Sequence, residues 1–423
     1  MSFDKRNTPA VVVGAAGACG LGIVRSLSQA NVPVILVDIT PYAPAMHTRF
    51  ARKVLVSQLA GPSLIRDLLA LASTLSTPPV LFLTSDEAML TVSQYRSELA
   101  SKFRFTLPSH GCLTLLSQKR TFQDLAESLG FLVPRCVRIR SADNMDKLAE
   151  LRFPAVVKPT TKTAAYVNAH FARGYKVDSV DEAKAKCRLI LGAVPELVVQ
   201  EWVDGADTDL YFCLLYRSAD GSTLCSFVGR KISIWPPDVG LTASCTAAPE
   251  VGDALVSLTE AFFDQVSFVG IGGMEFKKDA QTGRFVMIEP TVGRVDAQEE
   301  VATIHGINIP LIAYLHEAGL PLPSVPANYV PKVWQNSWSH WRALRGNTFQ
   351  HFDTRGLKVV DAYWRLNDPM PAVIHSFSWP LKLLGTALSH RSKSNGVPYP
   401  TGAQTDSQIR VATRNSSFHI GRP

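Results

Sequence analysis

The sequence GMEFKKDAQTGRFVMIEP, from Gly273 to Pro290, decides the fold because it has the pattern of a tight β-hairpin. Successive side chains of a strand point to opposite faces, and both arms of this segment have strand-forming residues. Between them, Asp279 to Gly283 has the composition of a turn, with a glycine free to adopt a positive φ. The segment therefore predicts two antiparallel strands that carry a glutamate at each end.

The register of this hairpin decides whether its two glutamates meet. If residues 281–283 form a three-residue loop, Glu275 faces Glu289, with Cβ atoms about 4.5–5.5 Å apart. Like charges at that spacing destabilise a sheet, and Mg²⁺ between two carboxylates and nucleotide phosphates would explain them. A loop longer by one residue would place the glutamates on opposite faces. The alternative is a structural one, in which the two edge glutamates pair with Lys277 and Arg294.

Composition bounds the class of protein. The 423 residues allow two or three domains, and 46% hydrophobic residues, 19% charged residues and a mean hydropathy of +0.07 are typical of a globular protein. The net charge is +7, but the basic residues are scattered and no aromatic–basic pattern accompanies them, which argues against nucleic acid. We expect the charge to serve an anionic small substrate, a weak membrane-surface contact or no specific role.

The cysteines and the N-terminus bear on the compartment. Seven single cysteines without a CxxC motif indicate reduced thiols and no zinc site. The first residues have no apolar signal-peptide core, and no run of about 18 apolar residues occurs. We therefore expect a cytoplasmic protein without a transmembrane segment.

The N-terminal third has the pattern of a βαβ unit. Ala10–Gly14 is an apolar strand followed by a glycine-rich turn, and a second strand ends at Asp38. This pattern suggests dinucleotide binding with Asp38 on a ribose, and hence an NAD(P)-dependent oxidoreductase, although Ala16 breaks the glycine fingerprint. A later strand, Val80–Leu83, leads into Thr84–Glu87, which either faces a ligand or caps the next helix.

Three further motifs follow in the middle of the chain. Lys119 to Gly130 is predicted to be an amphipathic helix that Gly130 ends. FPAVVKP, residues 153–159, places Lys158 at the end of an apolar strand. LVVQEWVDG, residues 197–205, is a strand that ends in polar groups.

In this order and spacing, these motifs resemble the ATP-grasp superfamily, specifically its predicted carboxylate–amine ligases, over most of residues 10–320. The resemblance implies an α/β protein, α+β in its ATP-grasp core. It implies a Rossmann-like domain over residues 1–110 and an ATP-grasp domain over 111–320, with a small lid at about 135–200 and a C-terminal subdomain at about 201–320. It also implies an ATP- and Mg²⁺-dependent ligase that joins a carboxylate, such as that of an amino acid, to an amine through an acyl phosphate.

The resemblance also assigns roles to individual residues. Lys119 and Lys158 would contact ATP, and Gln200, Glu201 and the backbone of Val203 would line the adenine pocket. The implied ribose ligand is Asp207, with Asp209 as second choice. The remaining assignments are Glu275 and Glu289 for Mg²⁺, Arg294 for the substrate carboxylate, and Arg230 and Lys231 for the γ-phosphate, the alternative for Arg230 and Lys231 being a charged strand edge. Residues 240–244 are expected to form a loop near the substrate.

Two departures from the family pattern are apparent. Thr291 stands where the family usually has a metal-binding asparagine, and its hydroxyl is the implied third ligand of Mg²⁺. The stretch from Pro159 to Gly174 lacks the usual glycine-rich phosphate loop. Both favour a second hypothesis, a non-catalytic ATP-grasp protein that binds nucleotide.

The C-terminal part has no derivable role. Residues 321–393 form a predicted aromatic-rich extension, within which residues 379–393 either lie on a membrane surface or pack as a helix on the core. Residues 394–423, rich in Ser, Thr, Pro and Gly, are expected to be disordered. A homodimer is the default oligomeric state.

Overall fold

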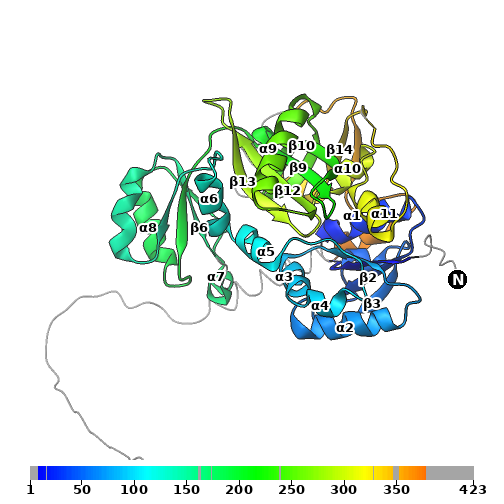
Figure 1. The fold of residues 1–423 in the computed structure, drawn as a ribbon. Helices are drawn as coiled ribbons and strands as arrows, with labels where there is room; N and C mark the ends of the chain where they lie inside the picture. The colour runs from blue at the N-terminus through cyan, green and yellow to red at the C-terminus, as the bar shows by residue number, and fades with distance from the viewer. Residues whose placement is uncertain are drawn as a thin grey trace, which may run out of the picture. The chain divides into compact units, whose positions relative to one another are not determined.

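The computed structural model describes residues 8–15, 17–160, 163–172, 174–237, 240–326, 328–345 and 352–377. Three sheets organise them (Figure 1). The first sheet is parallel throughout, in the order β3-β2-β1-β4. Its strands are β1 (Ala10–Val13), β2 (Val34–Asp38), β3 (Arg52–Leu55) and β4 (Val80–Leu83). Its helices are α1 (Gly17–Ser28), α2 (Gly61–Ser73), α3 (Asp86–Gln94) and α4 (Arg96–Leu99). This is the predicted Rossmann-like arrangement.

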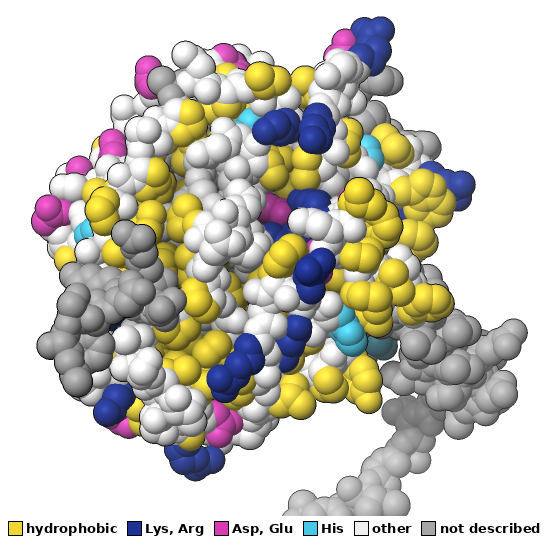
Figure 2. Space-filling view, turned by 90° about the vertical axis from the view of Figure 1, so that its right-hand side faces the viewer, with side chains coloured by type: hydrophobic (Ala, Val, Ile, Leu, Met, Phe, Trp, Pro, Cys, Tyr) yellow, Lys and Arg dark blue, Asp and Glu magenta, His cyan; other side chains and the backbone are white. Residues whose placement is uncertain are grey.

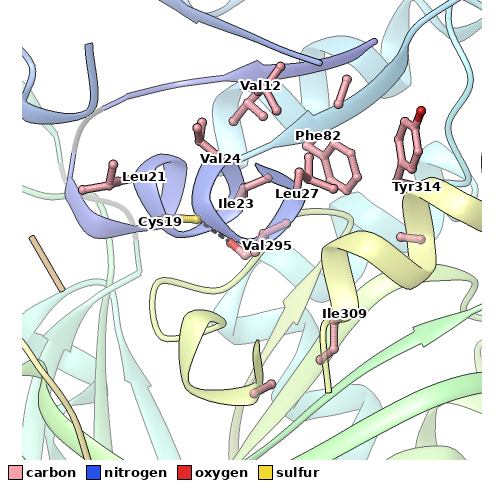
Figure 3. Packing of buried hydrophobic residues seen from close by; sticks show 14 of the residues in the cluster. Val12, Cys19, Leu21, Ile23, Val24, Leu27, Phe82, Val295, Ile309 and Tyr314 are labelled. Carbon is pink, nitrogen blue, oxygen red and sulfur yellow. Dashed lines mark hydrogen bonds between the residues drawn. The ribbon is translucent and has the colours of Figure 1, made fainter. Parts of the chain in front are cut away.

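The short apolar strands of this sheet are buried on both faces, as their continuous Val/Leu/Ile runs require. Val12 packs with α1 on one face, while Val11 packs with α2 and α3 on the other. Figure 3 shows the first of these faces, where Leu27, Phe82 and Tyr314 meet. Tyr314 belongs to α11, so this core continues into the last part of the chain.

The second sheet has the order β5-β8-β6-β7 and only antiparallel pairs. Its strands are β5 (Cys136–Ile139), β6 (Ala155–Pro159), β7 (Tyr175–Val177) and β8 (Leu197–Glu201). Alternate residues such as Val157 and Val199 pack against α8 (Val180–Ile190) and the 3₁₀ helix η3 (Ala142–Glu150). The residues that alternate with these, such as Lys158 and Gln200, therefore point to the opposite face of the sheet. α7 (Ala164–Asn168) follows β6.

The third sheet has seven strands in the order β13-β12-β9-β10-β11-β14-β15, antiparallel except for the last pair. Its strands are β9 (Leu210–Arg217), β10 (Thr223–Trp235), β11 (Leu241–Ala247), β12 (Gly270–Lys278), β13 (Phe285–Val292), β14 (Lys332–Gln335) and β15 (Lys358–Asp361). α5 (His110–Ser117) and α6 (Lys119–Ser128) contact β13. The other elements are η2 (Pro44–His47), η4 (Asp207–Asp209), η5 (Pro249–Val251), α9 (Gly252–Gln265), α10 (Glu300–Ile304), α11 (Ile309–Ala318) and α12 (Ser337–Arg345).

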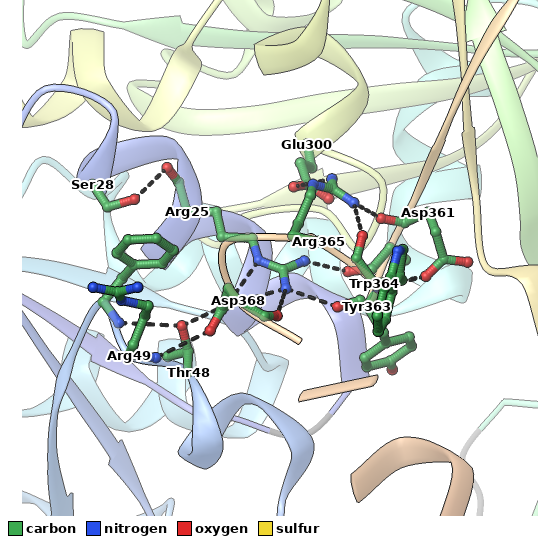
Figure 4. A network of polar contacts seen from close by, with 12 residues as sticks. Arg25, Ser28, Thr48, Arg49, Glu300, Asp361, Tyr363, Trp364, Arg365 and Asp368 are labelled. Atoms are coloured by element: carbon green, nitrogen blue, oxygen red, sulfur yellow. Dashed lines mark hydrogen bonds and ion pairs between the residues drawn. The ribbon is translucent and has the colours of Figure 1, made fainter. Parts of the chain in front are cut away.

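The C-terminal extension is built into this architecture. Its strands β14 and β15 complete the third sheet, so the sheet crosses the boundary expected at residue 320. Further on, Asp368 forms a buried ion pair of 3.0 Å with Arg25 of α1 (Figure 4). Residues up to Ser376 form one compact unit. The predictions for 379–393 and 394–423 lie outside the described residues. Among those that are described, no helix is both long and apolar enough to span a membrane.

Candidate active site on the carboxylate hairpin

The hairpin of β12 and β13 brings Glu275 and Glu289 directly opposite one another, as predicted. The three-residue loop on which that prediction depended does not form, however, because the Asp279 amide donates to the Arg284 carbonyl at 2.9 Å and leaves four residues between them. A regular ladder from that turn would place the glutamates on opposite faces. A β-bulge at Ile288 absorbs the extra residue, since Phe276 pairs with Met287 and Glu275 pairs with Glu289.

Each glutamate holds a lysine. Nζ of Lys231 lies 2.5 Å from Oε2 of Glu275, and Nζ of Lys119 lies 3.0 Å from Oε2 of Glu289. Burial alone would lower the pKa of Lys231, but the Glu275 carboxylate outweighs it and the pKa is raised. Lys119 lowers the pKa of Glu289 to about 2. The site is therefore a compact, charge-balanced cluster of two carboxylates and two ammonium groups.

The alternative partners expected for the glutamates, Lys277 and Arg294, are engaged elsewhere. Nζ of Lys277 donates to the backbone carbonyls of Gly205, at 2.8 Å, and Ala206. Burial lowers the pKa of Lys277. Lys277 follows Glu275 by two residues on the same strand, so the alternation of side chains places it on the same face as Glu275.

The sheet separates Arg230 from Lys231. Gly229 and Glu275 both pair with Phe212, so Lys231, two residues beyond Gly229, shares the face of Glu275. Arg230 points to the opposite face, where its guanidinium lies 4.7 Å from the Tyr211 ring centre. The structure thus brings only one of these two cations to the carboxylates.

The second sheet contributes Lys158 and Gln200. Nζ of Lys158 donates to Oε1 of Gln200 at 2.9 Å, and Nε2 of Gln200 donates to Oε1 of Gln123 at 3.2 Å. Burial and the nearby Lys119 lower the pKa of Lys158 to about 8. Gln123 escaped the sequence analysis, although it follows Lys119 by four residues on one helix face. These side chains line a pocket together with Pro159, Val198, Ile288 and Glu289.

Glu201, the last residue of β8, does not direct its carboxylate as the expected adenine pocket requires. The Glu201 carboxylate turns away from Gln200 and accepts from Arg152, through the backbone amide at 2.9 Å and the guanidinium at 3.0 Å. Only its backbone can therefore contribute to an adenine pocket beside Val203. Oδ2 of Asp207 accepts from the Ile234 amide at 3.3 Å.

The other ribose candidate, Asp209, accepts from the Ala206 amide at 2.8 Å and so stabilises its own turn. Both carboxylates thus accept a backbone amide, and the assignment of Asp207 as the ribose ligand stays a prediction. Of the phosphate-loop candidates, Thr161 and Lys162 lie outside the described residues. Thr160 donates to the Glu196 carbonyl at 3.2 Å.

Arg294 joins the first sheet to the hairpin. Its Nε donates to Oδ1 of Asp86 at 2.5 Å, at the start of α3. Burial would lower the pKa of Arg294, but Asp86 and Asp296 outweigh it and the pKa is raised. Ser85 is the N-cap of α3 and accepts from the Ala88 amide at 3.2 Å. The capping alternative is thus correct for Ser85, while Asp86 faces the arginine.

Thr291 lies on the same face as Glu289, two residues further along β13. Its hydroxyl donates to Oδ2 of Asp296 at 2.8 Å, a carboxylate that the sequence analysis missed. Oδ1 of Asp296 accepts from the Gln298 amide at 3.1 Å, and the Thr242 hydroxyl donates to Gln298. Residues 241–244 belong to strand β11, so the loop expected there is wrong.

A divalent ion would have two carboxylates at this site. Among the described residues, no group of three or more His, Cys, Asp or Glu side chains could hold a metal ion. Mg²⁺ is usually bound through one or two carboxylates together with substrate phosphates, so the pair of Glu275 and Glu289 suits it.

Asp38 forms hydrogen bonds within the N-terminal glycine turn and with the segment after β2. Asp38 is 1% exposed, and its carboxylate accepts from the amides of Ala15, at 2.6 Å, and Thr40, at 3.1 Å. A side chain used in this way cannot reach a ribose. The observation argues against the oxidoreductase alternative.

Comparisons with known proteins agree with this reading of the fold. No protein-family model matches the chain, and a search of curated proteins finds no relative. Solved structures do match. One is N5-carboxyaminoimidazole synthetase from Staphylococcus aureus complexed with ADP, at a TM-score of 0.59 and 14% identity over 78% of this chain and 83% of that chain.

Two others have different activities. The biotin carboxylase domain of 2-oxoglutarate carboxylase from Hydrogenobacter thermophilus has a TM-score of 0.59 and 13% identity over 77% of this chain and 73% of that chain. Phosphoribosylglycinamide synthetase from Anaerococcus prevotii has a TM-score of 0.57 and 11% identity over 77% and 80%, respectively. All three are ATP-grasp proteins, and this chain has the ATP-grasp fold with a Rossmann-like N-terminal domain.

Proposed function

We propose that the protein is an ATP- and Mg²⁺-dependent ligase that joins a carboxylate to an amine. The observation that carries the proposal is the in-register pair of Glu275 and Glu289, with lysines from three other elements around it. The structural neighbours support it, since one of them was solved with ADP and another with MgADP and bicarbonate.

The residues divide the work of binding ATP. Lys158 and Lys119 reach the pocket between the second sheet and β13, where they would neutralise phosphates as point charges. The backbone beside Val203 and the Asp207 carboxylate would hold adenine and ribose. Mg²⁺, held by Glu275 and Glu289, would supply charge neutralisation to the β- and γ-phosphates.

The proposed reaction has two steps. An oxygen of the substrate carboxylate attacks the γ-phosphorus, the bond to the β,γ-bridging oxygen breaks, and ADP leaves with an acyl phosphate formed. The amine nitrogen then attacks the acyl carbon, inorganic phosphate leaves, and the nitrogen loses a proton. The protein contributes position and positive charge to both steps. Lys231 and Arg294 both interact electrostatically with Asp296, the partner of Thr291, and would balance the developing negative charge.

The non-catalytic alternative has its own support. The Thr291 hydroxyl donates to Asp296, and each of the two glutamates forms an ion pair with a lysine. A protein that binds nucleotide without turnover would show the same geometry. Two further expectations belong with the proposal. The seven cysteines are all free thiols, which supports a reducing, cytoplasmic environment. A homodimer stays a prediction.

Hydroxylamine trapping tests the ligase proposal without knowledge of the natural amine. The protein is incubated with MgATP, hydroxylamine and single carboxylates, amino acids first, and ADP and hydroxamate are measured together. We expect one group of carboxylates to give equal amounts of both products, and Glu289→Gln to abolish both. Mg²⁺-dependent ATP binding without ADP release from any carboxylate would support the non-catalytic alternative instead.

A further inference from the structure

The loop from Ala362 to Asp368, which follows β15, is firmly anchored by its polar residues. The Asp368 side chain is 1% exposed and accepts from the guanidinium of Arg25 at 3.0 Å. The Arg365 guanidinium donates to Glu300 at 2.7 Å. Figure 4 shows these anchors converging on α1 and α10. The loop is therefore held in one conformation against the core.

The apolar side chains of the same loop point outward. Leu366 is 90% exposed and Trp364 is 53% exposed, although each is next to an anchored residue. Val359 before the loop and Met370 after it are also exposed. We call Val359, Trp364, Leu366 and Met370 the apolar C-terminal patch. The buried residues of this loop are charged and the exposed ones are apolar, the reverse of the usual order, and exposed apolar side chains so close in sequence point to an interaction surface.

The neighbouring helix extends the exposed apolar surface. Asp361 accepts from the Trp364 amide at 2.7 Å and from the Ser337 amide at 3.1 Å, so the loop adjoins the start of α12. On α12, Trp341 and Leu344 are exposed. Figure 2 shows one face of the molecule, on which hydrophobic side chains lie with Lys and Arg among them.

The charge of the sequence beyond the patch indicates what this surface meets. Residues 369–423 contain six Lys and Arg but one acidic residue, Asp406, and so contribute five of the seven net positive charges. The sequence WPLKLLGTALSHRSK at 379–393, which residues 371–378 separate from Met370, has no acidic residue. Exposed Trp and Leu followed in sequence by basic residues are the combination that binds an anionic lipid surface.

We propose that the apolar C-terminal patch docks the protein on a membrane surface that contains anionic lipids. Trp364 and Leu366 would enter the headgroup region, where an indole and an aliphatic side chain are favourable. The basic residues that follow would add electrostatic attraction to the lipid headgroups. The proposal is independent of the reaction that the carboxylate hairpin performs.

Co-sedimentation of the full chain with vesicles tests this proposal. The vesicles consist of phosphatidylcholine alone or phosphatidylcholine with phosphatidylglycerol. We expect binding to the anionic vesicles only, with affinity that falls as salt is raised. The variant Trp364→Ser/Leu366→Ser should bind at least about tenfold more weakly. The matched control, Tyr42→Ser/Leu189→Ser, removes two exposed apolar side chains elsewhere and should bind like the native protein.

Three outcomes would overturn the proposal. The first is no binding to anionic vesicles, or equal binding to neutral ones. The second is unchanged binding of the patch variant, which would assign the contact to the basic residues alone. The third is a native dimer in light scattering that the patch variant converts to a monomer without vesicles, because the patch would then be an interface between two copies.

Discussion

Glu275 and Glu289 are direct cross-strand partners, and each is neutralised by a lysine from a different element, Lys231 of β10 and Lys119 of α6. Two carboxylates in this position repel one another unless cations accompany them. The lysines fill that role here. With MgATP bound, Glu275 and Glu289 would hold the metal, and the Lys119 ammonium would turn toward the phosphates.

Variants of Lys231 and Glu275 should show that an apolar pair can replace this ion pair for stability but not for ATP binding. Lys231 is 4% exposed, so Lys231→Met leaves Glu275 without its buried partner, and we expect a loss of about 1–3 kcal/mol in the free energy of unfolding. The double variant Lys231→Met/Glu275→Met should recover much of this stability, because an apolar pair can replace a buried ion pair. It should not recover Mg²⁺-dependent ATP binding. Urea unfolding measures the first effect, and a single variant as stable as the native protein would contradict the account.

The lowered pKa of Lys158 predicts how ATP affinity depends on pH. The amine is mostly charged below its pKa of about 8 and mostly neutral above it, so ATP affinity should fall as the pH rises beyond that value. Lys158→Arg keeps its charge throughout this range and should give a flatter profile. Calorimetric titrations at a series of pH values decide the matter. A native profile that stays flat to about pH 9.5 would show that Lys158 does not meet the phosphates.

The same pKa shift has a consequence for stability. The folded protein holds fewer protons on Lys158 than the unfolded chain between pH of about 8 and the ordinary lysine pKa of about 10.5. The contribution of Lys158 to the free energy of unfolding should therefore increase as the pH rises through that window. Binding of phosphates at neutral pH works in the opposite direction, because it favours the charged amine.

The ion pair of Arg25 and Asp368 should be worth far more than an exposed one. Asp368→Ala leaves a guanidinium that is 5% exposed without its carboxylate, so we expect a loss of about 3–5 kcal/mol on urea unfolding. Asp353→Ala removes the partner of Arg355, a pair at 2.7 Å on the surface, and should have a much smaller effect than Asp368→Ala. Equal losses in the two variants would show that residues after β15 do not anchor α1.

Because of the buried Glu299 carboxyl, we expect the free energy of unfolding to fall as the pH rises. Burial raises the pKa of this carboxyl to about 8, and Oε2 is buried without a hydrogen-bond partner among the described residues. The folded state therefore holds more protons than the unfolded chain between pH of about 4.5 and about 8, and the free energy of unfolding drops across this window. Glu299→Gln should remove this part of the pH dependence and be the more stable protein at pH of about 9. Parallel pH profiles of the two proteins would contradict the assignment.

The sequence sufficed for the parts of the site that follow strand periodicity. The apolar strand before Lys158 and the arms of the hairpin predicted their elements, because alternation fixes which side chains share a face. The facing of Glu275 and Glu289 was predicted correctly with the wrong loop, since the bulge at Ile288 cancels the error. Bulges depend on packing across the sheet, and the sequence carries no local signal for this one.

Other features depend on contacts between distant segments. Asp296 meets Thr291 across the turn after β13, and Asp368 meets Arg25 from the opposite end of the chain. Neither pair lies on one helix face or one strand pair, so no spacing in the sequence predicts it. Arg230 and Lys231 were treated as one cationic site, although alternation along β10 requires adjacent side chains to point to opposite faces.

The most direct test of the carboxylate site is ATP binding by calorimetry with and without Mg²⁺, on the native protein, Glu289→Gln and the control Glu98→Gln. Glu289 is about half exposed, so its amide variant should unfold at the native urea concentration, and Glu98 is an exposed glutamate far from the hairpin in sequence. We predict Mg²⁺-dependent binding in the native protein and the control, and a loss of at least about tenfold in Glu289→Gln. A native protein that ignores ATP, or a Glu289→Gln variant that binds MgATP as tightly as the native protein, would contradict a metal and nucleotide site on this hairpin.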